Sequence, residues 1–128
     1  MRGWQKRCSW TLLMLTFAAA PAAHAEVVDI QWSGDGRFAH TGAVAAGKFL
    51  ELCGKLPAGL KVNWEFEASA PMDFNVHYHV DKDVIFPAKL SAVAMAREML
   101  TTEIPQDYCW MWTNPSAAAA RLSVKLQR

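Results

Sequence analysis

Two neighbouring stretches of the chain alternate between apolar and polar residues with a period of two. In residues 60–67 the apolar positions are Leu60, Val62, Trp64 and Phe66. In residues 73–80, one face carries Phe74, Val76, Tyr78 and Val80, and the other carries Asp73, Asn75, His77 and His79. Successive side chains of a β-strand point to opposite faces, so this period indicates half-buried strands rather than a helix. Both stretches are predicted to be strands, with a turn over Ala68 to Met72 because Pro71 interrupts the pattern.

Weaker signals predict further strands on both sides of this pair. They cover residues 48–53, 84–86, 108–113 and 121–127, with 26–31 as a weak edge strand. Residues 37–47 have no clear period, and the strand at 84–86 is expected to stop at Pro87. Residues 88–100 are ambiguous, because their composition favours a helix whereas the neighbouring patterns favour a strand from about Met95 to Ile104. About five to eight short strands separated by turns predict a single all-β domain, an antiparallel β-sandwich.

The first 25 residues have the composition of a secretory signal peptide. Basic residues precede an apolar run from Thr11 to Ala20, and Ala23-His24-Ala25 is a candidate cleavage site. The run is too short to cross ~30 Å of hydrocarbon, and no second run of membrane length follows. We expect a signal peptide over residues 1–25, cleavage near Ala25, and a periplasmic or secreted β-sandwich domain over residues 26–128 with its core at about 44–127.

Composition and cysteine content narrow the class of protein. Cleavage would leave 103 residues with ten basic and twelve acidic side chains, a net charge of −2. This balance excludes a nucleic-acid binder built on bulk positive charge, and a chain that is 52% hydrophobic is not disordered. Cys53 and Cys109 remain, and two thiols in an exported chain of this size favour one disulfide. A metal-thiolate pair and two free thiols are the alternatives, although neither cysteine has a CxxC partner or a histidine beside it in the sequence.

The two cysteines lie in short motifs, Glu51-Leu52-Cys53 and Tyr108-Cys109-Trp110-Met111-Trp112-Thr113-Asn114. These motifs resemble the GOLD (Golgi dynamics) family, in which an early Glu-x-Cys-like strand pairs by disulfide with a late Tyr-x-x-Cys-aromatic-x-Asn segment. Met72 to Tyr78 is similar to the Asp-led central strand of that family, and Arg121 to Leu126 is similar to its closing strand. The likeness covers about Gly47 to Leu126. It implies a GOLD-like or jelly-roll-like sandwich, a Cys53–Cys109 disulfide and a binding-module function.

The chain departs from the family in three respects. Tyr108 is adjacent to Cys109 and so closer to it than in the family, and Asp107 stands where the family has glycine. The chain also ends after the last predicted strand, where the membrane-bound relatives continue into a coiled coil, a membrane span and a cytoplasmic tail. Their cargo-receptor role is therefore not carried over. The resemblance implies an exported module that binds a protein, a peptide or a small ligand of unknown identity.

His77-Tyr78-His79 is a His-x-His motif, and on a strand both imidazoles share one face. Glu65 and Glu67 occupy the polar face of the preceding strand, which is the expected antiparallel neighbour. Imidazoles with thioether or carboxylate ligands suit copper or zinc in an oxidising compartment. A periplasmic metal-binding protein is therefore the alternative function, against the simpler interpretation of a solvated polar strand face. Further candidate ligands or partner contacts are His40, Met72, Asp73, Asn75, Glu65 and Glu67.

The aromatic residues sit on the apolar faces of the predicted strands and are interpreted as core. Exposure of Trp110 or Trp112 would instead indicate a platform for a carbohydrate or another hydrophobic ligand. The sequence contains no Gly-x-Ser-x-Gly elbow, no phosphate-binding glycine loop and no HExxH motif. Enzyme function is not expected, and no catalytic residue is assigned.

Overall fold

A computed structural model describes residues 25–128 as a domain of seven β-strands. The strands are β1 (Glu26–Asp29), β2 (Arg37–Val44), β3 (Phe49–Leu56), β4 (Lys61–Val80), β5 (Asp83–Thr101), β6 (Gln106–Thr113) and β7 (Ala120–Gln127). The predicted signal peptide lies outside the described residues except for Ala25. Within the described part of the chain, no helix is long and apolar enough to span a bilayer. The predicted all-β fold is confirmed.

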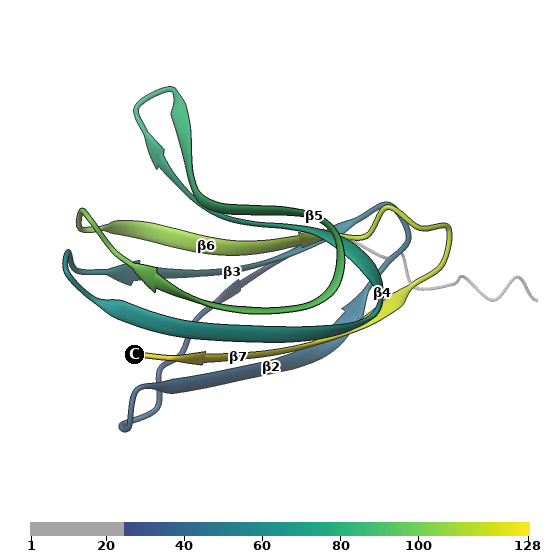
Figure 1. Cartoon of the computed structure of the whole chain (residues 1–128), viewed down its shortest axis with the longest axis horizontal. Coiled ribbons are helices and arrows are strands. Elements are labelled where there is room, and N and C mark those ends of the chain that lie inside the picture. Colours follow the sequence, from purple (N-terminus) through teal and green to yellow (C-terminus); the bar gives the residue numbers. More distant parts are fainter. Residues whose placement is uncertain (1–24) are drawn as a thin grey trace, which may run out of the picture.

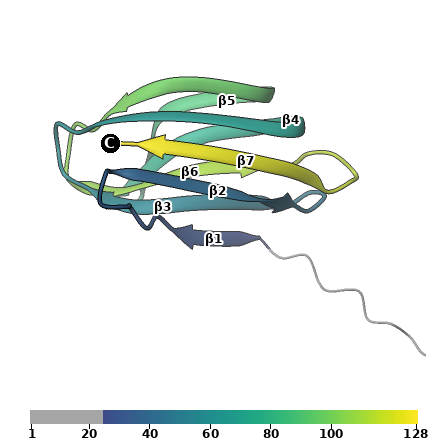
Figure 2. The same ribbon diagram turned by 90° about the horizontal axis from the view of Figure 1, so that it is seen from below.

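The strands form one sheet that curls so that its two halves face each other (Figure 1). The sheet order is β1-β3-β6-β4-β7-β2, and β5 pairs with the remaining edge of β4. Strand β4 is long and bent: residues 63–68 pair with β7, whereas residues 73–77 pair with β6. The two halves of the sandwich are thus joined by hydrogen bonds through β4 and β5. The pairing is antiparallel except for β1, which runs parallel to β3 at one edge (Figure 2).

The core lies on the concave face of the curled sheet. Its buried side chains occupy every second position of β4, β6 and β7, as the period of two predicts. Rings from the two halves of the sheet meet there: Phe66 lies 5.0 Å from Phe74 and 5.5 Å from Trp112, measured between ring centroids. Trp110 and Trp112 are fully buried, so the interpretation of these aromatic residues as core is confirmed.

The strands were predicted to be interrupted at Pro71 and at Pro87, and both predictions are wrong. Each proline lies at a position where no backbone N–H is needed for hydrogen bonding to the neighbouring strand. Pro71 lies in β4 between the stretch paired with β7 and the stretch paired with β6. Pro87 lies in β5 at a register shift against β4, between Ile85 and Ala88. Bulges and unpaired stretches tolerate a residue without a backbone donor. The chain therefore continues through both prolines as strand.

Strands β2 and β5 include residues whose apolar and polar pattern did not clearly predict a strand. Residues 88–100 are strand throughout, because β5 pairs with β4 along most of its length. Residues 37–44 form β2, which pairs with β7 over all eight residues. In both cases long-range pairing overrides weak local preference.

Candidate functional site

The disulfide predicted from the cysteine count is present between β3 and β6. Cys53 and Cys109 are directly opposite each other in the strand register, with their Cα atoms 4.1 Å apart. Their neighbours Leu52 and Trp110 are fully buried and point into the core. Because side chains alternate, the disulfide lies on the outer face of the sheet and links adjacent strands rather than the two halves of the sandwich.

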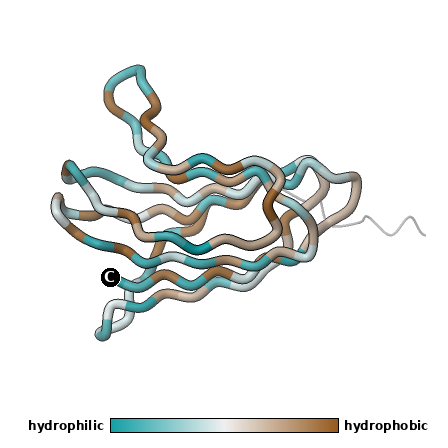
Figure 3. Tube along the Cα trace, in the orientation of Figure 1, coloured by the Kyte–Doolittle hydropathy of each residue, from teal (hydrophilic) through white to brown (hydrophobic). Residues whose placement is uncertain are grey.

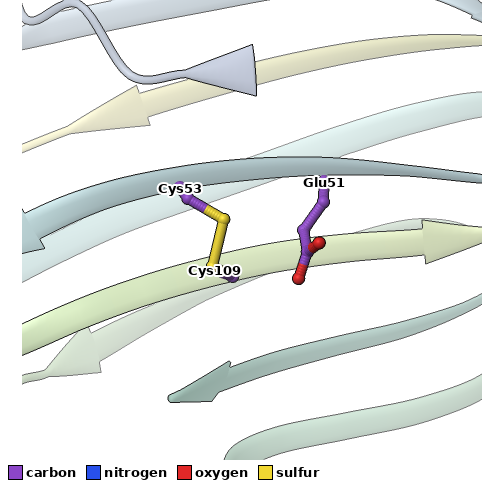
Figure 4. Close-up of side chains that lie close together, drawn as sticks. All are labelled: Glu51, Cys53 and Cys109. Atoms are coloured by element: carbon purple, nitrogen blue, oxygen red, sulfur yellow. A yellow bond between two sulfur atoms is a disulfide. The ribbon is translucent and has the colours of Figure 1, made fainter. Parts of the chain in front are cut away.

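Glu51 and His77 lie beside this disulfide on the same outer face. Figure 4 shows the Glu51 side chain next to the sulfur bridge, and its carboxylate lies within 4.8 Å of both sulfur atoms. His77 on β4 is directly opposite Cys109 on β6. The Nε2 atom of His77 lies 2.9 Å from Oε1 of Glu51, and its Nδ1 atom lies 2.7 Å from Oδ1 of Asn75. We call Glu51, Asn75, His77 and the disulfide the outer-face cluster.

His77 is buried although it is on the face predicted to be solvated. Only 6% of the residue is exposed. The ring of Phe86 from β5 lies 6.0 Å from the His77 ring, and the His79 ring lies 5.3 Å away. Burial lowers the pKa of His77 below its ordinary value, the charge of Glu51 opposes this shift, and His79 adds to it. The interpretation of this strand face as fully solvated is thus wrong at His77.

A β-hairpin projects from the sheet next to this cluster. It contains the end of β4, a turn at Asp81 with a φ of 53°, and the start of β5. Figure 1 shows it standing away from the other strands, and Figure 3 shows apolar segments along it. We call residues 80–86 the hairpin tip. Its large apolar side chains are between 38% and 45% exposed: Val80, Val84, Ile85 and Phe86.

Polar contacts hold the base of this hairpin. The Nε2 amide of Gln106 donates a hydrogen bond to the backbone oxygen of His79 at 2.9 Å. The ammonium group of Lys89 lies 4.9 Å from the centre of the Phe86 ring. Phe86 thus connects the tip to His77 on one side and to a cation on the other. The exposed apolar residues are presented on a base that is tied to the sheet.

The structure brings together only part of the predicted metal set. His77 and His79 share a face, as predicted, but Met72 is fully buried on the opposite, core-facing side of β4. His40 is on β2, which is separated from β4 by β7. Both ring nitrogens of His77 already face oxygen atoms of Glu51 and Asn75. This arrangement does not favour the predicted copper or zinc site.

Glu65 and Glu67 lie far from the histidines along the same strand. They were expected on a neighbouring strand, but β4 is continuous, so they belong to its other half. Glu65 is opposite Arg97 on β5 and opposite Lys125 on β7, where its carboxylate lies 4.0 Å from the Lys125 ammonium group. Both glutamates are exposed and line a shallow hollow of about 450 Å³.

Asp73, Trp110 and Trp112, which were also predicted to contact a ligand or partner, make contacts within the fold instead. The backbone N–H of Ala92 donates a hydrogen bond to Oδ1 of Asp73 at 3.0 Å, across the bend of β4. Full burial of Trp110 and Trp112 excludes them as an exposed ligand platform. Sequence reasoning missed the hairpin tip and the contact between Glu51 and His77. The only available signal for Glu51 was its two-residue spacing from Cys53, which places both on one face.

Comparisons with known proteins identify the type of fold. No protein-family model matches the chain, and no curated protein sequence matches it. The structure is similar to PliG of Aeromonas hydrophila, a periplasmic inhibitor of g-type lysozyme, with a TM-score of 0.57 at 13% identity, covering 81% of this chain and 96% of that one. PliG of Salmonella Typhimurium gives a TM-score of 0.54 at 11% identity, covering 80% and 97%. The pre-peptidase C-terminal domain of a Bacillus anthracis collagenase gives 0.56 at 11%, covering 78% and 95%.

Similarity at this level of identity establishes a shared all-β fold. The resemblance to the GOLD family stays a prediction, since no family model matches. The disulfide that the resemblance implied is present.

Proposed function

We propose that this chain is an exported, non-catalytic domain that binds a protein partner through the hairpin tip. The observation that carries the proposal is the exposure of Val80, Val84, Ile85 and Phe86 on one projecting hairpin. Clustered exposed apolar residues with a polar rim are typical of protein-binding surfaces. Here the rim is formed by Asp81, Lys82, Asp83 and Lys89.

The narrow shape of the hairpin suits a partner with a cleft. A two-stranded projection can place apolar side chains inside a cleft while its charged turn contacts the edges. The base of the tip is tied to the sheet by Gln106 and packed on His77 through Phe86, so little conformational freedom is lost on binding. A signal-peptide-like start and a disulfide support export of the domain.

The outer-face cluster supports a non-catalytic role. The ring nitrogens of His77 lie within hydrogen-bonding distance of Glu51 and Asn75, and no hydroxyl or thiol accompanies them as a nucleophile in the described contacts. Both cysteines of residues 25–128 are joined to each other. The structural neighbours include two inhibitors of g-type lysozyme, so a peptidoglycan hydrolase of this type, with a substrate cleft, is the first partner class to test.

The proposal is tested by titrating residues 26–128 into a g-type lysozyme and related peptidoglycan hydrolases, measuring both heat of binding and lytic activity. We compare Val84→Asp/Ile85→Asp in the tip with Met95→Asp/Met99→Asp, which changes two apolar residues of the same strand that are 66% and 50% exposed. The tip variant should bind at least about tenfold more weakly, because charges replace buried apolar contacts. The control variant should bind like the unaltered protein.

One result would overturn the proposed contact surface, and another would overturn the proposed partner class. Equal weakening by both variants would mean that the tip is not the contact surface. A lack of binding to every hydrolase of the panel would reject that partner class. Far-ultraviolet circular dichroism of both variants establishes that they remain folded.

A further inference from the structure

The disulfide, Glu51 and His77 gather four metal-ligand side chains within a small part of the outer face. The carboxylate oxygen of Glu51 and the two sulfur atoms lie within 4.8 Å of one another. The Nε2 atom of His77 lies 2.9 Å from the same carboxylate, and His77 is directly opposite Cys109 in the strand register. In the oxidised protein the sulfur atoms are bonded to each other and are not thiolate ligands.

Reduction would change the chemistry of this cluster without moving any strand far. A dithiol reductant attacks one sulfur atom, forms a mixed disulfide with it and releases the other cysteine. Its second thiol then resolves the mixed disulfide, so the protein gains two electrons and two protons and the reductant becomes a disulfide. Both cysteines are half-buried rather than fully buried. Their strands remain paired through the other residues of the β3–β6 ladder.

His77 adjoins the other three residues through its contact with Glu51. The Asn75 amide faces Nδ1 of His77 and can accept a hydrogen bond from it through Oδ1. When a metal is bound, a proton held on Nδ1 by Asn75 would leave Nε2 unprotonated, and the metal would lie between Nε2 and the Glu51 carboxylate.

We propose that reduction of Cys53–Cys109 opens a zinc site made of Cys53, Cys109, His77 and Glu51. Two thiolates, one imidazole and one carboxylate are a donor set that suits tetrahedral Zn²⁺. The two protons gained on reduction leave as the thiols bind the ion. The site differs from the set predicted from the sequence, because it needs the thiolates and uses neither His40 nor Met72. Its test does not require that the hairpin tip binds a partner.

The experiment uses Co²⁺ as a spectroscopic substitute for Zn²⁺. Residues 26–128 are prepared oxidised, and also reduced with a phosphine and desalted without oxygen. Titration of the reduced protein should give one bound Co²⁺ per chain, thiolate-to-cobalt charge transfer in the near ultraviolet and the visible bands of tetrahedral Co²⁺. Zn²⁺ should displace the Co²⁺. The oxidised protein should give none of these bands.

Variants distinguish a four-residue site from a pair of thiolates. In reduced protein, His77→Ala and Glu51→Gln should each weaken Zn²⁺ binding at least about tenfold, since even loss of a partner of a ligand costs 10–100-fold. His79→Ala is the matched control on the same strand face and should leave affinity unchanged. Absence of thiolate bands in folded reduced protein overturns the proposal. Bands and affinity that are indifferent to both His77 and Glu51 overturn it as well.

If the reduced chain unfolds, refolding by Zn²⁺ tests the proposed zinc site. In that event Zn²⁺ should restore the native circular dichroism spectrum of the unaltered chain but not that of His77→Ala. Failure of Zn²⁺ to restore the fold would overturn the proposal.

Discussion

Asn114 is a single buried polar side chain that fixes the loop between β6 and β7. It is completely buried, and its Nδ2 amide donates hydrogen bonds to the backbone oxygens of Val44 at 3.0 Å and Ala118 at 2.8 Å. Its Oδ1 atom accepts hydrogen bonds from the backbone N–H and the hydroxyl group of Ser116. The asparagine that ends the late cysteine motif in the sequence therefore has a structural role in this protein.

We expect Asn114→Ala to lower the free energy of unfolding by about 1–3 kcal/mol, because the buried carbonyl of Val44 loses its donor and the loop loses its other bonds to Asn114. Asn63→Ala, at an exposed position of β4, is the matched control and should change stability by less than about 0.5 kcal/mol. Urea denaturation followed by tryptophan fluorescence measures both. Equal effects of the two variants would contradict the role assigned to Asn114.

His77 should make the stability of the oxidised protein depend on pH. Its pKa in the fold lies below the ordinary value of 6.5, so the unfolded chain takes up a proton first as the pH falls. The stabilising contribution is complete above about pH 6.5 and is lost as the pH falls through the lower pKa of the folded state. His77→Gln, which does not titrate, should flatten this part of the stability profile. Chemical denaturation between weakly acidic and neutral pH tests the difference, and His79→Gln should retain most of this part of the profile, because burial, the largest cause of the shift, is kept.

At the scale of elements, the bend that β4 and β5 share determines how the sheet curls. The β4–β5 register shifts between Glu67 and Met72 and again between Met72 and Phe74. Opposite the bend, Ala92 has a φ of 54°, in the left-handed region, and its N–H is held by Asp73. A side chain with a Cβ is disfavoured in this region, so Ala92 is a strained residue at the bend.

We therefore expect Ala92→Gly to raise the free energy of unfolding by up to about 1 kcal/mol, since glycine adopts a positive φ without steric cost. Ala94→Gly, two residues further along β5 at a residue without a positive φ, should lower stability by roughly 0.5–1 kcal/mol, because glycine adds conformational freedom to the unfolded chain there without relieving strain. Thermal unfolding of both variants gives the comparison. Destabilisation by Ala92→Gly as large as that by Ala94→Gly would rule out strain at Ala92.

At the scale of the whole molecule, the disulfide closes a long loop that includes β4, β5 and the start of β6. The cysteines are 56 residues apart in the sequence, so their bond restricts much of the unfolded chain. Cys53→Ala/Cys109→Ala should lower the free energy of unfolding by roughly 4 kcal/mol in the chain-entropy model. Urea denaturation of the variant, beside the oxidised protein with and without reductant, measures the loss. A loss below about 1 kcal/mol would mean that the bond contributes little to stability.

The sequence by itself determined the class of fold and the orientation of most strand residues. The period of two in β4, β6 and β7 follows from the alternation of side chains along one strand, so it can be recognised without knowing the neighbours. The buried positions of Trp64, Phe66 and Phe74 were predicted in this way. The single disulfide was also predicted from the two cysteines of residues 26–128, on the expectation that the chain is exported.

Only the tertiary structure decided which outward-facing residues meet. Glu51 and His77 are 26 positions apart in the sequence, and β6, a strand still later in the chain, brings β3 and β4 to either side of itself. The burial of His77 also depends on Phe86, which lies on β5. The sequence predicted only a short strand around Phe86, ending at Pro87, and did not predict that this strand pairs beside His77. Local periodicity assigns a residue to a face but contains no information on the order of strands. That order results from pairing between distant segments, and it separates His40 from His77 while placing Glu51 beside it.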